Sequence, residues 1–246
     1  MNISSTAIPS SSSIIKLIFI SGLSGSGKTT LGEQLKLQQK FLHFNVDIWA
    51  FGGDPIEESN LVPTPAMLAK RDPIIKEAFD TMAQQGFAKL TVKEDVPFSI
   101  WEQFFNLLCN EIIKVQTKYP EQVIVITFSV YLRSIRDYIR NRLPNIRFII
   151  LDPNIEIVAN RKVQHLRNTA QSRNLTLSQF LRSFHPDSDA PDMEESTIIG
   201  LLTDQAKNSA IGFENAGIEE VNTLGITGDL SIEEVYLKAL EFISSY

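Results

Sequence analysis

The 246-residue sequence has little of several features that define other classes of protein. Its single cysteine, Cys109, excludes an internal disulfide framework and a cysteine-rich metal site. Its three histidines are scattered and match no metal-ligand spacing. No apolar stretch approaches the length of a membrane-spanning helix. We therefore expect a soluble, cytoplasmic protein with no membrane partner.

The sequence also has fewer basic residues than acidic ones. There are 23 Lys and Arg residues against 29 Asp and Glu residues, which gives a formal net charge of −6. This balance disfavours a nucleic-acid partner held by bulk electrostatics. Residues 1–13 are rich in serine and carry no positive charge, so they match a signal or transit peptide poorly. We expect them to form a flexible lead-in to one domain over residues 14–246.

The most specific pattern is the octapeptide at residues 22–29, Gly-Leu-Ser-Gly-Ser-Gly-Lys-Thr, which fits the phosphate-loop pattern G-x-x-x-x-G-K-[ST]. Its glycines let the backbone turn, so that successive N–H groups cradle phosphate oxygens. The lysine can reach the β- and γ-phosphates, and the threonine hydroxyl is placed to hold Mg²⁺. We predict that ATP and Mg²⁺ bind here, through Gly22, Ser24, Gly25, Ser26, Gly27, Lys28, Thr29 and Thr30.

The flanking residues argue against a chance match in a glycine-rich turn. Residues 14–20 are a near-continuous apolar run, typical of a buried parallel strand, and residues 30–35 begin a helix that would face the phosphates. Alternating strands and helices predict an α/β fold of three layers, with a parallel sheet covered on both faces. Further strands are expected at 41–46, 123–128, 147–151 and 220–226, helices at 73–82, 100–117, 133–142, 154–182, 197–212 and 231–244, and loops at 48–65 and 186–196.

Polar residues follow the predicted strands at the edge where such sheets bind ligands. Asp47, Ser129 and Asp152 all stand at predicted strand carboxyl ends. We expect the strand that ends at Asp47 to lie beside the strand of the phosphate loop. Its carboxylate would then take the proton of an acceptor hydroxyl or hold Mg²⁺. The alternative is a turn or helix-capping aspartate.

The order of these motifs resembles the small-molecule kinases of the phosphate-loop class, in the superfamily of shikimate and adenylate kinases, and most closely the gluconate kinases. The resemblance is strongest over residues 123–161 and continues on the substrate side over residues 82–101. It implies an ATP-dependent phosphotransferase that acts on a hydroxyl of a gluconate-like sugar acid or related carbohydrate. It also implies a substrate-side insertion over residues 48–118 and a helical lid over residues 154–196. Family-like positions include Ser129, Arg133, Ser134, Arg136 and Asp137.

Arginines are spaced through the region where kinases of this class fold a lid over ATP. Lid arginines neutralise charge on the phosphates, and we predict this role for Arg161 and Arg167, with a solvated helix as the alternative. Arg133 is predicted to grip the acceptor or the transferring phosphate, with a surface arginine as the alternative. The predicted catalytic residues are Lys28, Asp47, Arg133 and Arg161, and the predicted Mg²⁺ ligands are Thr29 and Asp47.

Departures from the gluconate kinases leave the acceptor open. Val96 and Leu132 stand where that family carries an arginine and a lysine, so two cations for a sugar-acid carboxylate are missing. One alternative acceptor is a nucleoside or nucleotide, with Trp49 and Phe51 stacking on its base. Another reading is an ATP-binding pseudo-kinase or regulatory protein. A GTPase is disfavoured because the sequence has no N-K-x-D segment. The sequence leaves open whether the protein forms a homodimer.

Overall fold

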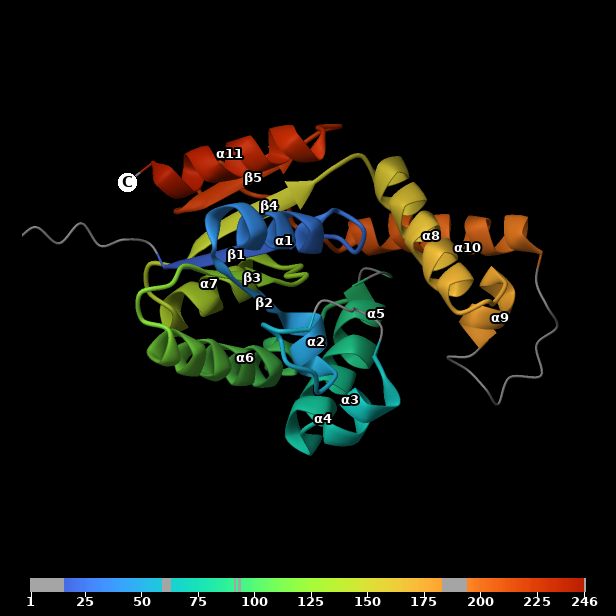
Figure 1. The fold of residues 1–246 in the computed structure, drawn as a ribbon, viewed down its shortest axis with the longest axis horizontal. Coiled ribbons are helices and arrows are strands. Elements are labelled where there is room, and N and C mark those ends of the chain that lie inside the picture. Colours follow the sequence, from blue (N-terminus) through green and yellow to red (C-terminus); the bar gives the residue numbers. More distant parts are fainter. Residues whose placement is uncertain (1–15, 59–62, 91, 93, 183–193, 246) are drawn as a thin grey trace, which may run out of the picture.

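A single parallel sheet forms the centre of the molecule (Figure 1). The structure is a computed structural model that describes residues 16–58, 63–90, 92, 94–182 and 194–245. Over these residues the strands lie in the order β2-β3-β1-β4-β5. Their bounds are β1 (Leu17–Gly22), β2 (Leu42–Asn45), β3 (Ile124–Thr127), β4 (Arg147–Asp152) and β5 (Thr223–Thr227). The predicted α/β fold with a parallel sheet is therefore confirmed.

Helices cover both faces of this sheet, as Figure 1 shows. On one face α1 (Lys28–Gln39) and α11 (Ile232–Ser244) pack on Ile18 and Ile20 of β1. On the other, α6 (Phe98–Lys118) and α7 (Arg133–Arg142) pack on Leu17 and Phe19. Successive strand residues point to opposite faces, so a strand buried on both sides must be apolar throughout. This explains the apolar run of β1, in which all six residues are buried.

The position of β2 differs from the prediction. Both β1 and β2 pair with β3, through Leu17↔Ile124 and Leu42↔Ile124, so β3 lies between them. The strand before Asp47 is thus not beside the phosphate-loop strand. Strand β2 also ends earlier than expected, because the Asn45 side chain accepts hydrogen bonds from the N–H groups of Asp47 and Ile48 and begins helix α2 (Val46–Ala50). Asp47 stands in the first turn of that helix.

Residues 46–90 are more helical than the sequence predicted. Helix α2 and helix α3 (Pro65–Lys70) lie partly within the expected loop at 48–65. After them come α4 (Pro73–Thr81), the π-helix η1 (Met82–Phe87) and α5 (Ala88–Leu90). Thr64 and Asp72 cap α3 and α4, each followed by a proline in the first turn. In η1, a Cβ on Gly86 would lie 2.7 Å from the Trp101 ring, so glycine permits this close packing.

Three helices lie together beside the sheet: α8 (Ile155–Ser172), α9 (Leu177–Arg182) and α10 (Glu195–Ile211) (Figure 1). The first two fall within the predicted lid, which stays a prediction. Val163, Leu177, Ile198 and Leu202 give these helices a separate apolar cluster. The helical region predicted over 154–182 consists of two helices, because the chain breaks between α8 and α9. Asn174 adopts φ 55° there, a left-handed conformation that a helix cannot continue through.

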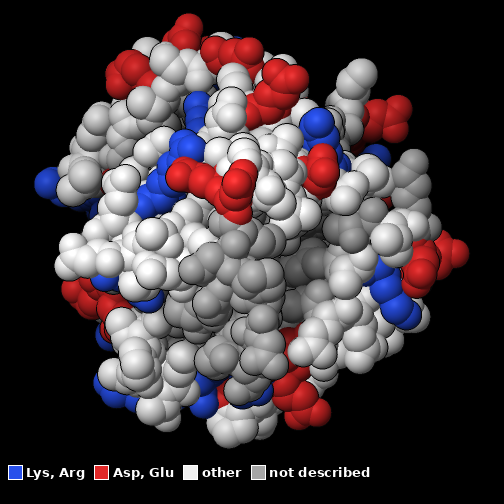
Figure 2. Space-filling model, turned by 90° about the vertical axis from the view of Figure 1, so that its right-hand side faces the viewer, with Lys and Arg blue, Asp and Glu red and all other residues white. Residues whose placement is uncertain are grey.

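The surface on the lid side mixes both signs of charge. In Figure 2, Lys and Arg side chains alternate with Asp and Glu side chains around the described part of this face. Across the described residues, no helix combines the length and the hydropathy needed to cross a bilayer.

Candidate functional site

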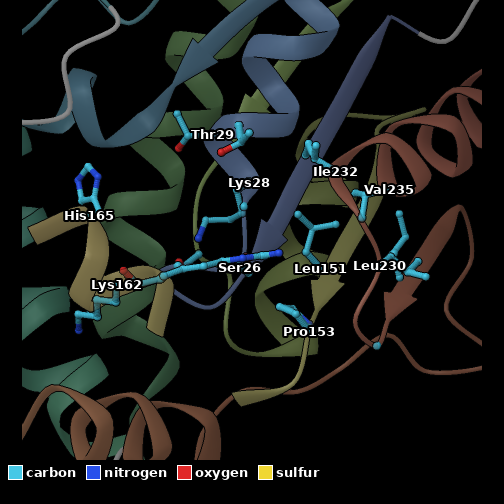
Figure 3. Close-up of a pocket in the computed structure, with 18 of the residues that line it drawn as sticks. Ser26, Lys28, Thr29, Leu151, Pro153, Lys162, His165, Leu230, Ile232 and Val235 are labelled. Atoms are coloured by element: carbon cyan, nitrogen blue, oxygen red, sulfur yellow. The ribbon is translucent and has the colours of Figure 1, made fainter. Parts of the chain in front are cut away.

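A cavity of about 540 Å³ opens at the carboxyl ends of the strands. The phosphate loop, Asp47, Ser129, one face of α8 and the segment from β5 to α11 all line it (Figure 3). Residues 24–30 of the loop all contribute to its wall, whereas Gly22 lies at the end of β1 just before it. The structure therefore brings together most residues that were predicted from the octapeptide.

The loop backbone follows the path that its glycines were expected to allow. Gly27 precedes α1 with φ 99°, in the region that side chains rarely adopt. A Cβ on Gly22 would lie 2.5 Å from the Leu151 carbonyl oxygen and 2.5 Å from Ser26 Oγ. Strand β4 thus packs directly against the loop, and any larger residue at position 22 would force the two apart.

One polar atom of the loop has no partner. Ser26 Oγ is buried and makes no hydrogen bond to any residue that the structure describes. A buried hydroxyl without a partner costs on the order of 1–3 kcal/mol, so such atoms are uncommon and often mark a ligand site. This loop, with its turned backbone and its free hydroxyl, fits the phosphate groups of a nucleotide.

Lys28 and Asp47 form a coupled pair inside the cavity. Lys28 Nζ donates to the carbonyl oxygens of Gly22 (3.0 Å) and Leu23 (2.8 Å). Burial lowers the pKa of Lys28 to about 8, and the Asp47 carboxylate acts in the opposite direction. Burial raises the pKa of Asp47, while the charge of Lys28 acts to lower it. The site therefore holds an ammonium and a carboxylate that are both costly to keep charged without a ligand.

The junction between β3 and α7 is fastened to the phosphate loop. Ser129 Oγ donates to the Gly22 carbonyl oxygen (2.9 Å), and the Val130 N–H donates to Ser21 Oγ (2.8 Å). Ser129 also lines the cavity. These bonds hold the residues that follow β3 against the end of β1, at the base of the cavity.

Helix α8 contributes three nitrogen-bearing side chains to the cavity: Arg161, Lys162 and His165. Residues three and four apart share one face of a helix, which explains why they line the same wall. Arg161 lies nearest the loop, since its Nη1 is 3.8 Å from where a Cβ on Gly27 would stand. Burial lowers the pKa of Lys162, whose Nζ donates to Gln205 Oε1 of α10 (2.8 Å). Lys162 and His165 were not predicted, although their spacing from Arg161 was visible in the sequence.

Arg167, predicted to contact ATP, lies further along α8 and does not line the cavity. Its Nε pairs with Glu195 at the start of α10. In this structure Arg167 joins α8 to α10, and its role in nucleotide binding stays a prediction.

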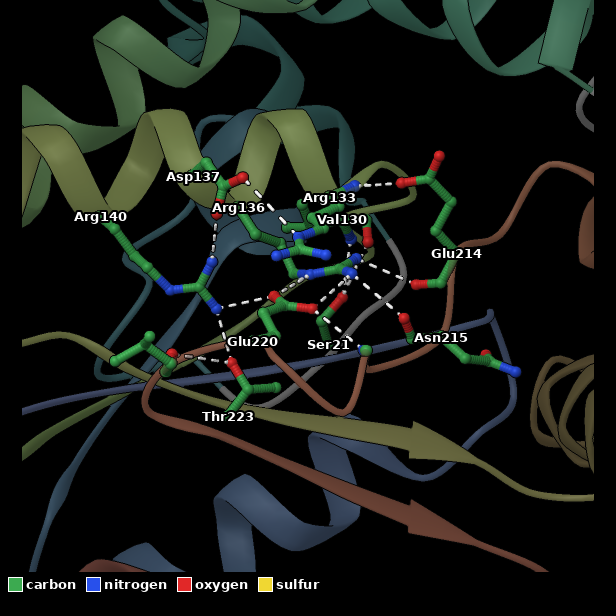
Figure 4. A network of polar contacts seen from close by, with 12 residues as sticks. Ser21, Val130, Arg133, Arg136, Asp137, Arg140, Glu214, Asn215, Glu220 and Thr223 are labelled. Carbon is green, nitrogen blue, oxygen red and sulfur yellow. Dashed lines mark hydrogen bonds and ion pairs between the residues drawn. The ribbon is translucent and has the colours of Figure 1, made fainter.

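Arg133 also lies apart from the cavity, in the network of Figure 4. Its side chain is half-exposed and stands 3.9 Å from Asp137, while its backbone N–H donates to the Glu214 carboxylate. Three residues on, Arg136 is fully buried and donates to both carboxylate oxygens of Glu220, at 2.7 and 3.0 Å. Arg136 is therefore a structural residue.

The predicted Mg²⁺ ligands Thr29 and Asp47 line the same cavity. Among the described residues, no group of three or more His, Cys, Asp or Glu side chains is gathered in a way that could hold a metal by itself. Mg²⁺ commonly binds through one or two protein oxygens together with phosphate oxygens and water. One hydroxyl and one carboxylate therefore fit an ion that arrives with a nucleotide.

Comparison with solved structures identifies the fold. A gluconokinase from Sinorhizobium meliloti has a TM-score of 0.50 at 15% identity, and the match covers 94% of this chain and 93% of that one. A sugar kinase from a Janibacter species has a TM-score of 0.50 at 14% identity, over 93% and 94% of the two chains. The fold is that of the phosphate-loop small-molecule kinases. No protein-family model and no curated protein matches the sequence.

Proposed function

We propose that this chain transfers the γ-phosphate of ATP to a hydroxyl of a small polar metabolite. The observation that carries the proposal is one cavity, within a kinase fold, that joins an intact phosphate loop to a half-buried carboxylate and to cations from helix α8. Phosphoryl transfer requires positioning and charge neutralisation above all, and this arrangement supplies both.

The loop residues would hold the nucleotide. The loop N–H groups and Ser26 Oγ would donate to phosphate oxygens, and Lys28 would exchange its bonds to the Gly22 and Leu23 carbonyls for the phosphates. Thr29 would hold Mg²⁺, with Asp47 reaching the ion through a water molecule, and the ion would supply charge neutralisation when it is bound. Arg161 of α8 would add a further positive charge beside the phosphates.

Asp47 is the residue best suited to the acceptor hydroxyl. Burial raises its pKa, and a carboxylate of raised pKa is a better proton acceptor near neutral pH than an ordinary one. We propose that Asp47 orients the hydroxyl and takes its proton. A cytoplasmic location and a homodimer stay predictions.

The proposed acceptor class is a gluconate-like sugar acid or a related carbohydrate. Two solved structures of the same fold, a gluconokinase and a sugar kinase, support this class. The nucleoside alternative is less well supported, because the two aromatic rings it needs are engaged in packing. Trp49 is buried against Phe44 and Phe104, and Phe51 packs edge-on against Phe79.

The test is a panel of sugar acids, sugars, polyols and nucleosides assayed for ADP release with Mg-ATP. Turnover should require one polar acceptor and should be lost in Lys28→Ala, whereas Lys207→Ala, at an exposed position on α10, should behave as wild type. ATP binding without turnover on any acceptor would favour the pseudo-kinase. Absence of ATP binding in the folded wild-type protein would reject both readings.

A further inference from the structure

One basic side chain of the cavity, Lys162, is not used by the proposed nucleotide site. Lys28 belongs to the phosphate loop, and Arg161 lies beside that loop, since its Nη1 is 3.8 Å from where a Cβ on Gly27 would stand. Lys162 is the next residue of α8 and lines the same cavity. Within the described part of the chain it forms no ion pair, and its Nζ donates to a neutral group, Gln205 Oε1 of α10 (2.8 Å).

The surroundings of Lys162 favour a negatively charged ligand. Burial lowers the pKa of Lys162, because the partly desolvated ammonium has lost hydration without gaining an opposite charge. A carboxylate at this point would supply that charge, and a hydrogen bond between two charged groups is roughly twice as strong as a neutral one. His165, one turn further along α8, lines the same wall and offers a ring nitrogen beside the ammonium.

Lys162 also lies at the end of the cavity that suits a polar acceptor. In Figure 3, Lys162 and His165 lie on one side of Lys28, and apolar side chains gather on the other. The apolar end is lined from β4, β5 and α11, and the residues listed in its wall, such as Leu151 and Ile232, offer no side-chain hydrogen-bond donor. An acceptor rich in hydroxyl groups would lose hydrogen bonds there, so the end with Lys162 is its more favourable position.

The basic residues around the cavity are engaged elsewhere. Four arginines of α7 and α8 each contact a carboxylate, and none of them lines the cavity: Arg133, Arg136, Arg140 and Arg167. An acidic acceptor in the cavity would therefore meet Lys162 as the positive charge that neither the phosphate loop nor a carboxylate of the described chain occupies.

We propose that Lys162 binds the carboxylate of a sugar-acid acceptor, with His165 beside it, so that helix α8 selects acids over uncharged polyols of the same chain length. The inference rests on the proposed function, since it takes the acceptor to lie in the cavity beside the phosphate loop. Lys162 would exchange its bond to Gln205 for the carboxylate. Asp47 would hold the hydroxyl that receives the phosphate, so the two ends of the acceptor would be held by different helices.

Binding measurements on the wild-type protein test the proposal independently of turnover. With a non-hydrolysable ATP analogue present, isothermal titration compares sugar acids with the polyols of the same chain, for example gluconate with glucitol. The best-bound acid should bind roughly 10–100-fold more tightly than its polyol, as expected for a hydrogen bond to a charged group. Equal binding of acid and polyol, or binding of neither, would overturn the proposal.

An assay of ADP release separates this proposal from the proposed function. Turnover of a polyol with no preference for the matching acid would overturn the role of Lys162 and leave the kinase intact. Acid-selective binding without ADP release on any acceptor would support the role of Lys162 and reject the proposed transfer.

Three variants assign the effect to Lys162. Lys162→Met keeps the length of the side chain but removes its charge, so it should weaken acid binding by roughly 10–100-fold and leave the polyol and ATP affinities unchanged. Gln205→Ala removes the present partner of Lys162 and should keep the preference for the acid. Lys207→Met, at an exposed position on α10, should behave as wild type. Weaker ATP binding in Lys162→Met with unchanged acid binding would assign the residue to the phosphates, and loss of the preference in Gln205→Ala would make the α8–α10 contact structural; either result contradicts the proposal.

Discussion

Ser26 shows how a single atom can be held ready for a ligand. Its hydroxyl is buried and unpaired within the described structure, next to Gly22, where a Cβ would touch it. In Ser26→Ala this unpaired group is gone, so the free energy of unfolding of the ligand-free protein should rise by up to about 1–3 kcal/mol. ATP affinity should fall in the same variant. Thermal denaturation and ATP titration measure the two changes, and Ser99→Ala, at an exposed position on α6, is the control. Loss of stability together with unchanged ATP affinity would contradict the assignment.

Lys28 gives the site a pH dependence. Burial lowers its pKa in the folded state to about 8, below the ordinary value of 10.5 that applies to the unfolded chain. Between these values the unfolded chain binds more protons, so this residue adds to stability as pH rises, and its unfavourable contribution is greatest below about pH 8. Phosphate binding has the opposite dependence, because it needs the charged amine. ATP affinity should therefore fall above about pH 8, whereas Lys28→Met should show weak binding without this step. The same pH step in Lys28→Met would rule out Lys28 as its source.

Substitution of Asp47 should lower turnover without abolishing ATP binding. Asp47→Asn keeps the size of the side chain but removes the base, so turnover should fall by roughly 10²–10⁴-fold while ATP still binds. Steady-state kinetics with the true acceptor and an ATP titration measure the two quantities, and Asp204→Asn on the exposed face of α10 is the control. A wild-type rate in Asp47→Asn would make Asp47 a helix-turn residue only.

Local residues were the predictable part of the site. The octapeptide works through its own backbone, and its order alone indicates the phosphate loop. Arg136 could not be assigned in this way. Its partner Glu220 lies 84 residues away in sequence, so nothing near Arg136 distinguishes a buried arginine from a solvated one. Arg133, three residues before it, has the same local pattern and is half-exposed.

Helix α7 and the connection from α10 to β5 are joined by the Arg136–Glu220 pair. Arg136 also donates to the carbonyl oxygens of Glu214 and Asn215. Burial acts to raise the pKa of Glu220, but hydrogen bonds and charge from Arg136 and Arg140 lower it to about 2. The carboxylate thus stays charged over the usual pH range, and its contribution to stability is lost only as pH falls towards 2.

Removing one partner of this pair should be costly. Arg136→Ala removes two hydrogen bonds to the buried Glu220 carboxylate and leaves Arg140 as its ion-pair partner, so the free energy of unfolding should fall by about 3 kcal/mol. Arg133→Ala, on the same helix, should change it by about 1 kcal/mol or less, because its ion pair is exposed. Chemical denaturation measures both variants. Equal destabilisation by the two substitutions would contradict the burial of Arg136.

Long, strongly patterned elements were predicted well, and short capped ones were not. Helices α6 and α7 have a clear apolar face, and α4 and α11 begin at recognisable caps. Helix α2 has only five residues and depends on the Asn45 cap, so the sequence pattern read as a loop. The break after α8 depends on the left-handed backbone at Asn174, which nothing in the helical periodicity required.

At the scale of the whole molecule, the class of fold followed from alternation, whereas the strand order did not. Every strand that is apolar throughout can take a central position, so the sequence gives no reason why β3 rather than β2 pairs with β1. The solved structures of about 15% identity make the same point, because the fold is shared where most residues differ. The layers of helix and sheet follow from the pattern of apolar residues in each element. Which strands are adjacent depends on contacts between residues that are distant in the sequence.

The lid should close over the site when both ligands are present. Helix α8 places Arg161, Lys162 and His165 on the cavity, so ligands that occupy it would restrain the helix. Amide hydrogen exchange across α8 and α9 should slow with a non-hydrolysable ATP analogue and the acceptor together, while exchange across α6 should stay constant. Mass spectrometry of peptides from these helices makes the measurement. Identical exchange in α8 with and without ligands would argue against closure.

The attachment of the lid also limits the kind of motion it can make. Helix α8 leaves the end of β4, and the chain after α10 returns to the β3–α7 junction, where the Glu214 N–H donates to the Tyr131 carbonyl oxygen (2.8 Å). That junction is the one that Ser129 and Val130 fasten to the phosphate loop. A segment attached to the sheet at one end could rotate in any direction. The segment from α8 to α10 is attached at both ends, so it can only tilt about the line that joins the two attachments. We therefore expect any tilt of these helices to be transmitted, through the β3–α7 junction, to the residues that line the cavity.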